Sequence, residues 1–465
     1  MIAVPTFDAE LLRRYDRPGP RYTSYPTAPQ FRPGFDGHDL ERAARDSNDD
    51  PIPQRLSLYV HVPFCVSPCF YCGCNRVITR DFSRSAPYVN RLVREAGLLA
   101  PLFDRDREVV QLHFGGGTPN FLSPAQIGRM LEMLRRHFRF SEAADRDFSI
   151  ELDPRFVTPE EIGELAALGF NRASLGVQDF DPIVQEAVNR IQSVEQTLGI
   201  IDACRAHGMR SINVDLIYGL PKQTDASFAR TIDTVIALRP DRIAAYSFAH
   251  VPWIRAHQKL LRVEDLPSAD QKLRLFVDAR QRLIDAGYVA IGMDHFALPG
   301  DDLARAAATG TLHRNFMGYT TRPAPDLVGL GVSAIGDVAG AFTQNTKKLS
   351  AYYRAIDEGR LPVERGYALD PDDQIRRHVI AQLMCAMVLD VHEVERRFGI
   401  DFDAYFAREL QELADGPVRH GLLREHAGVL RVTPRGRALV RNICMTFDRH
   451  LREARAATPV FSRTV

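Results

Sequence analysis

Three cysteines stand close together near residue 70. Cys65, Cys69 and Cys72 are separated by three and then by two residues, and they directly follow an apolar run that predicts a strand. Spacings this short let one loop place three thiolates around a single inorganic centre, and thiolates are soft ligands that suit iron–sulfur clusters. Three ligands on a four-iron cluster leave one iron open, as catalytic zinc sites leave one position open. The pattern therefore predicts an iron–sulfur cluster that can take a further ligand.

A structural zinc site is the alternative for these cysteines. Such sites normally use four ligands arranged as two separated pairs. The second pair is missing here, although Cys74 and His61 lie nearby, so the spacing favours the open cluster. The other three of the seven cysteines are isolated in apolar stretches, where we expect small buried side chains: Cys204, Cys385 and Cys444.

Length and composition limit the class of protein. A chain of 465 residues exceeds one hydrophobic core, so two or three domains are expected. The 59 basic and 59 acidic residues give a formal charge of +0, which argues against a nucleic-acid-binding protein. No run approaches the about 18 apolar residues of a membrane span. The first ten residues lack a basic segment before an apolar core, so we expect a cytoplasmic protein with reduced thiols.

Six apolar runs alternate with longer amphipathic stretches between residues 56 and 252. The predicted strands are 56–64, 109–114, 148–152, 173–177, 212–217 and 243–248, and the predicted helices between them are 88–102, 124–138, 159–168, 194–207 and 224–238. Ser123 and Thr158 precede prolines as helix caps, and Gly169 and Gly208 follow helix ends. This alternation predicts βαβ units around a parallel sheet. Six units are fewer than a closed barrel needs, so the expected fold class is α/β with a partial, open barrel.

The segments outside this barrel predict two further parts. Residues 1–55 contain a proline- and glycine-rich phrase at 19–26, which predicts an ordered arm. A helix at 268–286, a short strand and a glycine-rich region complete a central domain of residues 56–360. Residues 361–465 predict helices at 372–389, 391–398, 402–414 and 435–455 with a short β-pair at 422–432, a winged-helix-like shape. Winged helices often bind DNA, but 16 basic and 15 acidic residues from 361 onward lack a phosphate-binding excess.

Two motifs together resemble the radical S-adenosylmethionine superfamily. One is the cysteine motif with an aromatic residue, Tyr71, before its third cysteine. The other is Gly115-Gly116-Gly117-Thr118-Pro119, directly after the second predicted strand. Glycine lets the backbone approach a ligand closely, and in this superfamily the glycine-rich segment contacts the methionyl amino group of S-adenosylmethionine. The resemblance implies one [4Fe–4S] cluster held by Cys65, Cys69 and Cys72.

Further phrases narrow the resemblance to the oxygen-independent coproporphyrinogen III oxidases. They are Gly19-Pro20-Arg21-Tyr22-Thr23-Ser24-Tyr25-Pro26, Cys72-Gly73-Cys74-Asn75, Gly176-Val177-Gln178-Asp179-Phe180, the segment 215–224, and His313-Arg314-Asn315-Phe316. The likeness runs from about residue 10 to the C-terminus. It implies a radical enzyme of haem biosynthesis that turns two propionate side chains of coproporphyrinogen III into vinyl groups, giving protoporphyrinogen IX and carbon dioxide.

The family binds two S-adenosylmethionine molecules, and matching residues imply both sites. Tyr59, Gly116 and Glu151 would hold the cluster-bound molecule. Residues of the second site would be Gln178, Arg190, Asp215, Ala249 and Ile335, with Tyr71, Gly117 and Thr118 beside it. Each of the polar residues has a structural alternative: a buried salt bridge for the carboxylates, a surface position for the arginine and a loop hydrogen bond for the glutamine.

The substrate and partners follow from the same resemblance. A tetrapyrrole with four carboxylates needs guanidinium and amide groups, and we expect Arg21, Tyr22, Asn315 and Arg322 to contribute, with the arm covering the pocket. The chain departs from the family at Met317, where a polar residue is usual. Cys74 matches a family cysteine that does not bind the cluster. The electron donor and acceptor stay unidentified, and we expect a monomer.

A haem-delivery protein is the non-enzymatic alternative. Some relatives carry the cluster motif yet act as haem-binding proteins, and these lack the arm phrase and the cysteine that matches Cys74. Both features are present in this chain. The sequence therefore favours the enzyme.

Overall fold

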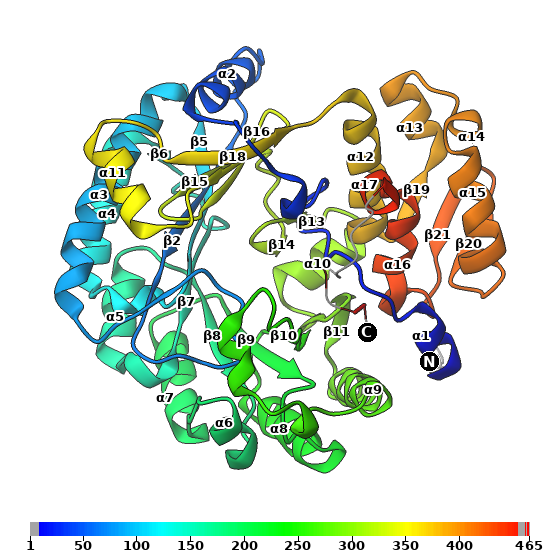
Figure 1. Cartoon of the computed structure of the whole chain (residues 1–465), viewed down its shortest axis with the longest axis horizontal. Coiled ribbons are helices and arrows are strands. Elements are labelled where there is room, and N and C mark those ends of the chain that lie inside the picture. Colours follow the sequence, from blue (N-terminus) through cyan, green and yellow to red (C-terminus); the bar gives the residue numbers. More distant parts are fainter. Residues whose placement is uncertain (1–8, 454–460, 462, 465) are drawn as a thin grey trace.

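A curved parallel sheet forms the centre of the molecule (Figure 1). The computed structural model describes residues 9–453, 461, 463 and 464. Six parallel strands lie side by side in the predicted order: β2 (Leu56–Val62), β5 (Glu108–Gly116), β7 (Asp147–Leu152), β8 (Arg172–Gln178), β9 (Ser211–Tyr218) and β10 (Arg242–Ser247). A seventh, β15 (Asp326–Leu330), pairs in parallel with β2. The predicted α/β class and the partial, open barrel are confirmed.

Helices cover the outer, convex face of this sheet (Figure 1). They are α3 (Ser85–Leu99), α4 (Pro124–His137), α5 (Pro159–Ala167), α6 (Pro182–Ala187), α7 (Val194–Ala206), α8 (Asp225–Leu238) and α9 (Ala269–Asp285). Ser123 and Thr158 close capping boxes at the starts of α4 and α5. Gly169 and Gly208 have φ of 104° and 73°, the left-handed backbone expected after a helix. The predicted helices of the barrel and their caps are confirmed.

Antiparallel strands extend the sheet at both edges; β11 (Val289–Gly292) is the short strand predicted after the helix at 268–286, and the other edge strands were not predicted. Strands β12 (His295–Ala297) and β11 follow β10 at one edge. At the other edge β16 (Ile335–Val338), β17 (Ala341–Asn345), β18 (Val363–Ala368) and β1 (Arg32–Pro33) follow β15. The remaining central elements are β3 (Phe64–Cys65), β4 (Val77–Ile78), β6 (Arg139–Phe140), α10 (Asp302–Thr309), β13 (His313–Asn315), β14 (Gly318–Thr320) and α11 (Leu349–Asp357).

The C-terminal part is mostly helical, as predicted, but its helix bounds differ. It contains α12 (Pro371–Ala386), β19 (Val388–Asp390), α13 (Val391–Phe398), α14 (Phe402–Tyr405), α15 (Ala407–Leu413), β20 (Leu423–His426), β21 (Val429–Val432), α16 (Val440–Cys444) and α17 (Arg449–Glu453). The first predicted helix ends early because Met387 is left-handed and β19 pairs with β21. Helix 402–414 breaks at the buried Phe406.

The predicted helix 435–455 is also wrong as one continuous element. It is divided into short turns because Asp448 leaves helical geometry and accepts a hydrogen bond from the backbone of Leu451 at 2.9 Å, starting α17. Residues 454 and 455 of that prediction lie outside the described residues. In the described part of the chain, no helix has the length and apolar character that crossing a membrane requires.

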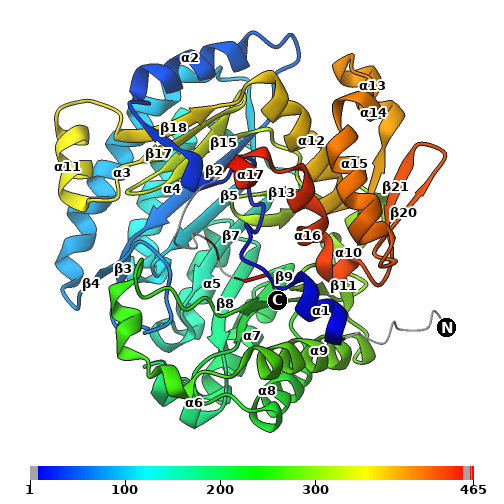
Figure 2. The same cartoon turned by 45° about the vertical axis from the view of Figure 1, so that its right-hand side comes forward.

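The N-terminal arm connects the barrel to the C-terminal part. Helix α1 (Ala9–Tyr15) lies between α9 and α16 (Figure 2): Arg13 pairs with Asp270 at 2.6 Å, and Asn442 donates to the Tyr15 carbonyl at 2.7 Å. Between α1 and α2 (Gly37–Asn48) the chain has only one short turn of 3-10 helix, Ala28–Gln30, and the two-residue strand β1. The arm is therefore held from both sides.

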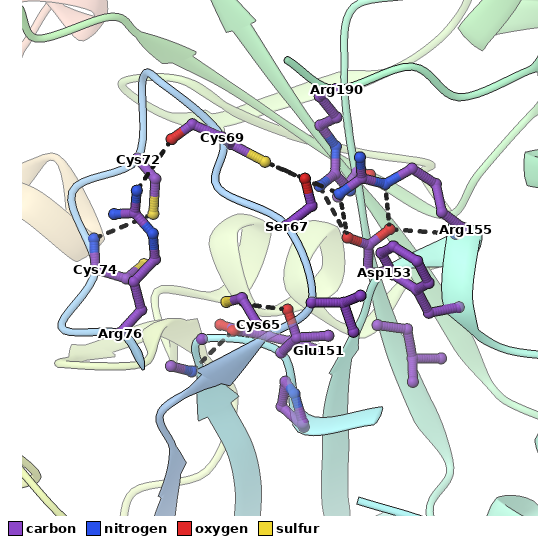
Figure 3. A pocket seen from close by; sticks show the side chains of 18 of the residues that line it. Cys65, Ser67, Cys69, Cys72, Cys74, Arg76, Glu151, Asp153, Arg155 and Arg190 are labelled. Atoms are coloured by element: carbon purple, nitrogen blue, oxygen red, sulfur yellow. Dashed lines mark hydrogen bonds and ion pairs between the residues drawn. The ribbon is translucent and has the colours of Figure 1, made fainter. Parts of the chain in front are cut away.

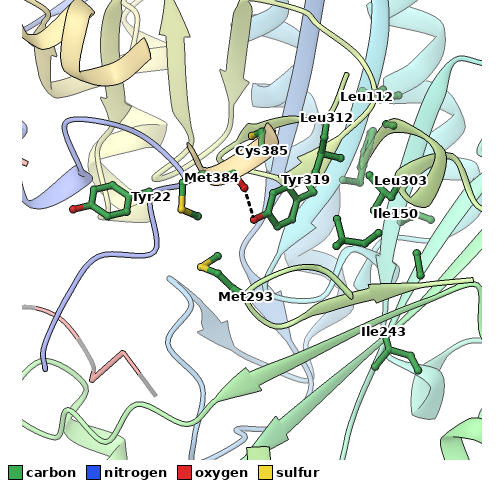
Figure 4. Packing of buried hydrophobic residues seen from close by; sticks show 14 of the residues in the cluster. Tyr22, Leu112, Ile150, Ile243, Met293, Leu303, Leu312, Tyr319, Met384 and Cys385 are labelled. Atoms are coloured by element: carbon green, nitrogen blue, oxygen red, sulfur yellow. Dashed lines mark hydrogen bonds between the residues drawn. The ribbon is translucent and has the colours of Figure 1, made fainter. Parts of the chain in front are cut away.

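One hydrophobic core spans the barrel interior and the C-terminal part (Figure 4). Barrel residues Leu112 and Ile150 belong to the same cluster as Met384 of α12. Tyr319 of β14 lies between them and donates a hydrogen bond to the Met384 carbonyl at 3.2 Å. The C-terminal part thus packs against the open side of the barrel.

A buried carboxyl group should make stability depend on pH. Glu95 of α3 is 0% exposed, and burial raises its pKa to about 7 despite hydrogen bonds from Gly331, Asn345 and Tyr352. A folded-state pKa above the unfolded value gives stability that is full below about pH 4.5 and is lost as pH rises to about 7. We expect the melting temperature to fall over that range, and to fall less in Glu95→Gln. Identical slopes in the two proteins would contradict this.

Candidate cluster and cofactor site

The cysteine loop lies at the carboxyl end of the parallel strands, the edge where barrel enzymes build their sites. It leaves β2 through the two-residue strand β3, which pairs with β4 and closes the loop. Cys65, Cys69 and Cys72 all line one cavity of about 220 Å³ (Figure 3). Arg155 and Arg190 approach the same cavity from the barrel side. The loop thus presents its three thiols to a space that continues into the barrel.

Each thiol has a hydrogen-bond donor beside it. The Thr118 hydroxyl donates to Cys65 Sγ at 3.3 Å, and the Cys74 amide donates to Cys72 Sγ at 3.4 Å. Guanidinium groups of Arg190 and Arg155 lie 3.7 and 3.9 Å from Cys69 Sγ. Donors to sulfur are among the factors that set the reduction potential of an iron–sulfur cluster.

The thiols differ in their protonation. The hydrogen bond with Cys74 and the charge of Arg76 lower the pKa of Cys72 to about 6. Burial raises the pKa of Cys65 to about 11. Coordination by a metal deprotonates a thiol outright.

These residues fit a [4Fe–4S] cluster. Three thiols line a single cavity, cations and amides surround the sulfurs, and the cavity has room beyond them. In the part of the chain that the structure describes, no group of three or more His, Cys, Asp or Glu side chains is placed to hold a metal ion. The three thiols therefore stand around the cavity rather than converging on one point.

Glu151 of β7 lines the same cavity from the barrel side. Its carboxylate accepts from the Gly116 amide at 3.1 Å and lies 3.3 Å from His113 Nε2. Burial alone would raise the pKa of Glu151, but the hydrogen bonds with His113 and Gly116 lower it, so this carboxylate is charged. Asp215 of β9 differs, because burial and the charge of Glu151 raise its pKa to about 6.

Arg190 is a buried cation at the far side of the cavity. Its Nη1 pairs with Asp153 at 3.0 Å, and its Nη2 donates to the Gly176 carbonyl. The Nε atom is buried without a hydrogen-bond partner. A buried donor without a partner is costly unless a ligand satisfies it, so this cavity fits a polar ligand such as an amino-acid carboxylate.

Most residues of the two implied S-adenosylmethionine sites line two adjoining cavities. The first cavity contains Tyr71, Gly116, Gly117, Thr118, Glu151, Gln178, Arg190 and Asp215. A second cavity of about 470 Å³ shares Cys74, Gly116 and Glu151 with the first and also contains Tyr59 and Ile335. The structure thus groups Ile335 with Tyr59, not with Gln178 as the resemblance implied. Ala249 lines neither cavity, and its carbonyl accepts from Gln258 at 3.1 Å.

The four expected substrate residues are placed differently from one another. Arg21 lines the second cavity and pairs with Asp294. Tyr22 is buried and donates to Asp448 at 2.9 Å, and Asn315 donates to Gln111 at 3.2 Å. Arg322 pairs with Asp145 and, like Tyr22 and Asn315, lines neither cavity. Of the arm, Arg21 and Thr23 reach the second cavity.

Several polar residues of the second cavity were missed from the sequence. Arg314 stands beside Asn315 in the phrase that carried the resemblance, so its position was a usable signal. Arg255 and Lys347 lie in loops with no motif and gave no signal. The polar lining residues that the sequence analysis did not assign to the site include His61, His113, Arg255, His295, Arg314, Gln344 and Lys347.

The glycine-rich loop approaches the cysteine loop too closely for a larger residue. A Cβ at Gly117 would lie 2.7 Å from the Pro63 carbonyl oxygen, and the Gly117 amide donates to the Val62 carbonyl at 2.7 Å. We expect Gly117→Ala to push the two loops apart and to weaken S-adenosylmethionine binding by about tenfold, the effect of losing one good hydrogen bond. Equilibrium dialysis of the reconstituted protein measures this. The control is Gly97→Ala in α3, where the nearest atom is 3.9 Å away; equal affinities in both variants would contradict the expectation.

Comparisons with known proteins agree with this geometry. The family model described as the radical SAM superfamily matches residues 59–235, and the HemN C-terminal domain matches residues 369–439. The oxygen-independent coproporphyrinogen III oxidase of Pseudomonas aeruginosa is 51% identical over 451 residues, covering 97% of each chain. The Escherichia coli protein of the same name is 45% identical over 459 residues, 99% of this chain and 98% of that one.

A solved structure gives the same result for the fold. It is described as coproporphyrinogen III oxidase (HemN) from Escherichia coli, a radical SAM enzyme. It superimposes with a TM-score of 0.90 at 44% identity and covers 96% of this chain and 100% of that one. This chain belongs to the oxygen-independent coproporphyrinogen III oxidases, a family of radical S-adenosylmethionine enzymes.

Proposed function

We propose that this chain decarboxylates two propionate side chains of coproporphyrinogen III to vinyl groups without oxygen, with one [4Fe–4S] cluster and two S-adenosylmethionine molecules. The adjacency of the two cavities supports the proposal most directly. Gly116 and Glu151 line both of them, so one wall separates the thiol cavity from the larger one. A radical formed beside the thiols can thus act on a substrate bound in the adjoining cavity.

The bound groups supply the radical chemistry and the protein positions them. When bound, the reduced cluster and S-adenosylmethionine supply an alkyl radical that removes a hydrogen atom from the propionate. Glu151 is held charged by Gly116 and His113, ready to accept hydrogen bonds from a ligand that spans both cavities. Asp215 accepts from Ser174 and Asn213 at 3.1 and 2.9 Å, which fixes the rotamer of its carboxyl group. No side-chain nucleophile is required.

Arg190 and its partners would hold the second S-adenosylmethionine. Asp153 fixes the guanidinium from one side, and Arg155 in turn pairs with Asp153 at 2.7 Å. The Nε atom, which has no hydrogen-bond partner among the described residues, is available to a ligand carboxylate, and Gln178 adds an amide to the lining of the same cavity. Equilibrium dialysis should give two molecules bound per chain in the wild type and one in Arg190→Met.

An anaerobic assay tests the activity. The cluster is reconstituted and reduced with dithionite, and S-adenosylmethionine, coproporphyrinogen III and an electron acceptor are added. Protoporphyrin after oxidation, with methionine and 5′-deoxyadenosine, is the expected result. Deoxyadenosine without a change in the porphyrin would point to another substrate.

The remaining partners follow from the chemistry. Each propionate gives up one further electron after the hydrogen atom, so a one-electron donor to the cluster and an acceptor are both required.

One chain contains every proposed site residue, which supports a monomer. Reduced thiols at the cluster support a cytoplasmic protein. The similarity to oxidases over nearly the full chain favours the enzyme over a haem-delivery protein. Stoichiometric haem binding without turnover would instead support haem delivery.

A further inference from the structure

The second cavity is cationic. Among the described residues, Glu151 is the one carboxylate that lines it. Four lining side chains carry positive charge: Arg21, Arg255, Arg314 and Lys347. Burial lowers the pKa of His61 and of His295 below the ordinary value, so these two histidines add no charge near neutral pH. Arg21, Arg255 and Arg314 are partly buried and Lys347 is exposed, and a cleft lined by charges of one sign attracts ligands of the opposite sign. The cavity is therefore suited to a ligand with several negative charges.

One end of the cavity is formed by Arg314 on β13 and Arg21 on the arm. Arg314 stacks on the Tyr319 ring at 4.4 Å, and it donates to the backbone carbonyls of Tyr22 at 3.3 Å and Arg21 at 3.4 Å. Its third nitrogen, Nη1, is buried and has no partner. No carboxylate of the described residues forms an ion pair with Arg314, because Asp294 pairs with Arg21 instead. The guanidinium is fixed in place with one donor left over.

The other end lies beside the cysteine loop. Lys347 follows β17, and its carbonyl accepts from Asn75 at 3.2 Å, which ties this segment to the loop. Arg255 lies close enough to Lys347 to lower the pKa of that amine, together with burial and Arg365. Within the described residues neither side chain has an ion pair or a hydrogen bond. Two cations are thus near each other, and the charge of Glu364 opposes the lowering of the Lys347 pKa without outweighing it.

The same cavity also offers a hydrogen-bond acceptor. Gln344 of β17 is 6% exposed, and its Oε1 is buried without a hydrogen-bond partner. An amide oxygen left without a donor needs one from a ligand. A porphyrinogen carries pyrrole N–H donors at its centre and carboxylates at its rim, which matches a cavity that holds both an acceptor and several cations.

We propose, on the basis of the proposed function, that the second cavity binds the carboxylates of the tetrapyrrole at two ends, Arg314 with Arg21 and Arg255 with Lys347, and that Gln344 accepts a pyrrole N–H. These contacts set the position of the propionates relative to the wall shared with the thiol cavity. They also make the enzyme prefer a tetracarboxylate over a porphyrin with two carboxylates. Charge-assisted hydrogen bonds give such a preference.

Substitutions that remove charge at each end test the assignment. The variants are Arg314→Gln, Arg314→Lys and the double variant Arg255→Gln/Lys347→Gln, each in the reconstituted full-length protein. Matched controls are Lys259→Gln and Lys348→Gln, exposed neighbours that do not line the cavity. The measurements are KM for coproporphyrinogen III, inhibition by coproporphyrin III and by the dicarboxylate mesoporphyrin IX, and dithionite-driven deoxyadenosine formation without substrate.

We expect the KM for coproporphyrinogen III to rise at least about tenfold in the glutamine variants, because each lost charge-assisted contact changes affinity by that order. The preference for coproporphyrin III should shrink, Arg314→Lys should recover part of the affinity, and deoxyadenosine formation without substrate should not change. An unchanged KM and preference in an active protein would overturn the assignment and leave the proposed function standing. A rise in the KM for S-adenosylmethionine instead would place these cations in the cofactor site, which also overturns it. Failure of the wild type to convert coproporphyrinogen III would refute the proposed function itself.

Discussion

The Cys65→Ser variant is expected to lose its bound iron and all measurable turnover. Cys65 is 8% exposed and lies with Cys69 and Cys72 around one cavity, and among the described residues that line this cavity none outside the loop carries a sulfur atom. A serine hydroxyl would keep the hydrogen bond with Thr118 but would not supply a thiolate. Iron analysis and the absorbance of the cluster after anaerobic reconstitution measure the loss directly, and deoxyadenosine formation measures its consequence.

Cys74→Ser is the matched control, because Cys74 lines the same cavity and neighbours Cys72. This variant should retain the iron and the cluster absorbance of the wild type. Full iron content in Cys65→Ser would contradict the three-ligand assignment. Loss of iron in Cys74→Ser as well would mean that the cluster has a fourth ligand and no open position.

The local sequence pattern predicted the barrel and the edge at which its site lies. Strands β2 and β5 are mostly buried and rich in apolar residues; the cysteine motif follows β2, and the glycine motif begins with the last two residues of β5. Parallel pairing then brings both motifs to one edge, since His61 lies opposite Gly115 in the register. This part of the site needs only the order of elements and the direction of the strands, both of which short-range periodicity supplies.

What the sequence could not predict depends on long-range contacts. Strand β15 has five residues, among them Gly329, and it is placed as a strand by parallel pairing with β2. Arg314 lies on β13 and Lys347 on the loop after β17, and only the folded chain places them in one cavity. The sequence also could not predict which arm residues reach the cavity. Tyr22 was expected at the substrate, but its hydroxyl donates a hydrogen bond to Asp448 in the C-terminal part. Tertiary packing decides which of two neighbouring polar residues faces the cavity.

A second large effect is expected far from the chemistry, at the amino ends of the strands. Arg107 and Asp326 form an ion pair whose side chains are 1% and 3% exposed. Arg107 also donates to the Gln54 carbonyl at 2.7 Å and to Ser47 at 3.1 Å, and Asp326 accepts from the Ala339 amide at 3.0 Å. The pair therefore joins the arm to the starts of β5 and β15.

Asp326→Ala should lower the free energy of unfolding by about 3–5 kcal/mol, because it leaves the Arg107 cation buried without a counter-charge. Asp357→Ala is the control: Asp357 is 40% exposed and pairs with Arg91 at the surface, where water screens the charges, so its loss should have a much smaller effect on stability. Urea or thermal unfolding of the two variants measures the difference. Turnover per bound cluster at low temperature should match the wild type in both, because barrel enzymes separate stability at the amino ends from chemistry at the carboxyl ends. A loss in Asp326→Ala no larger than in the control would show that water reaches Arg107, and reduced turnover per cluster would show that the two ends of the barrel are coupled.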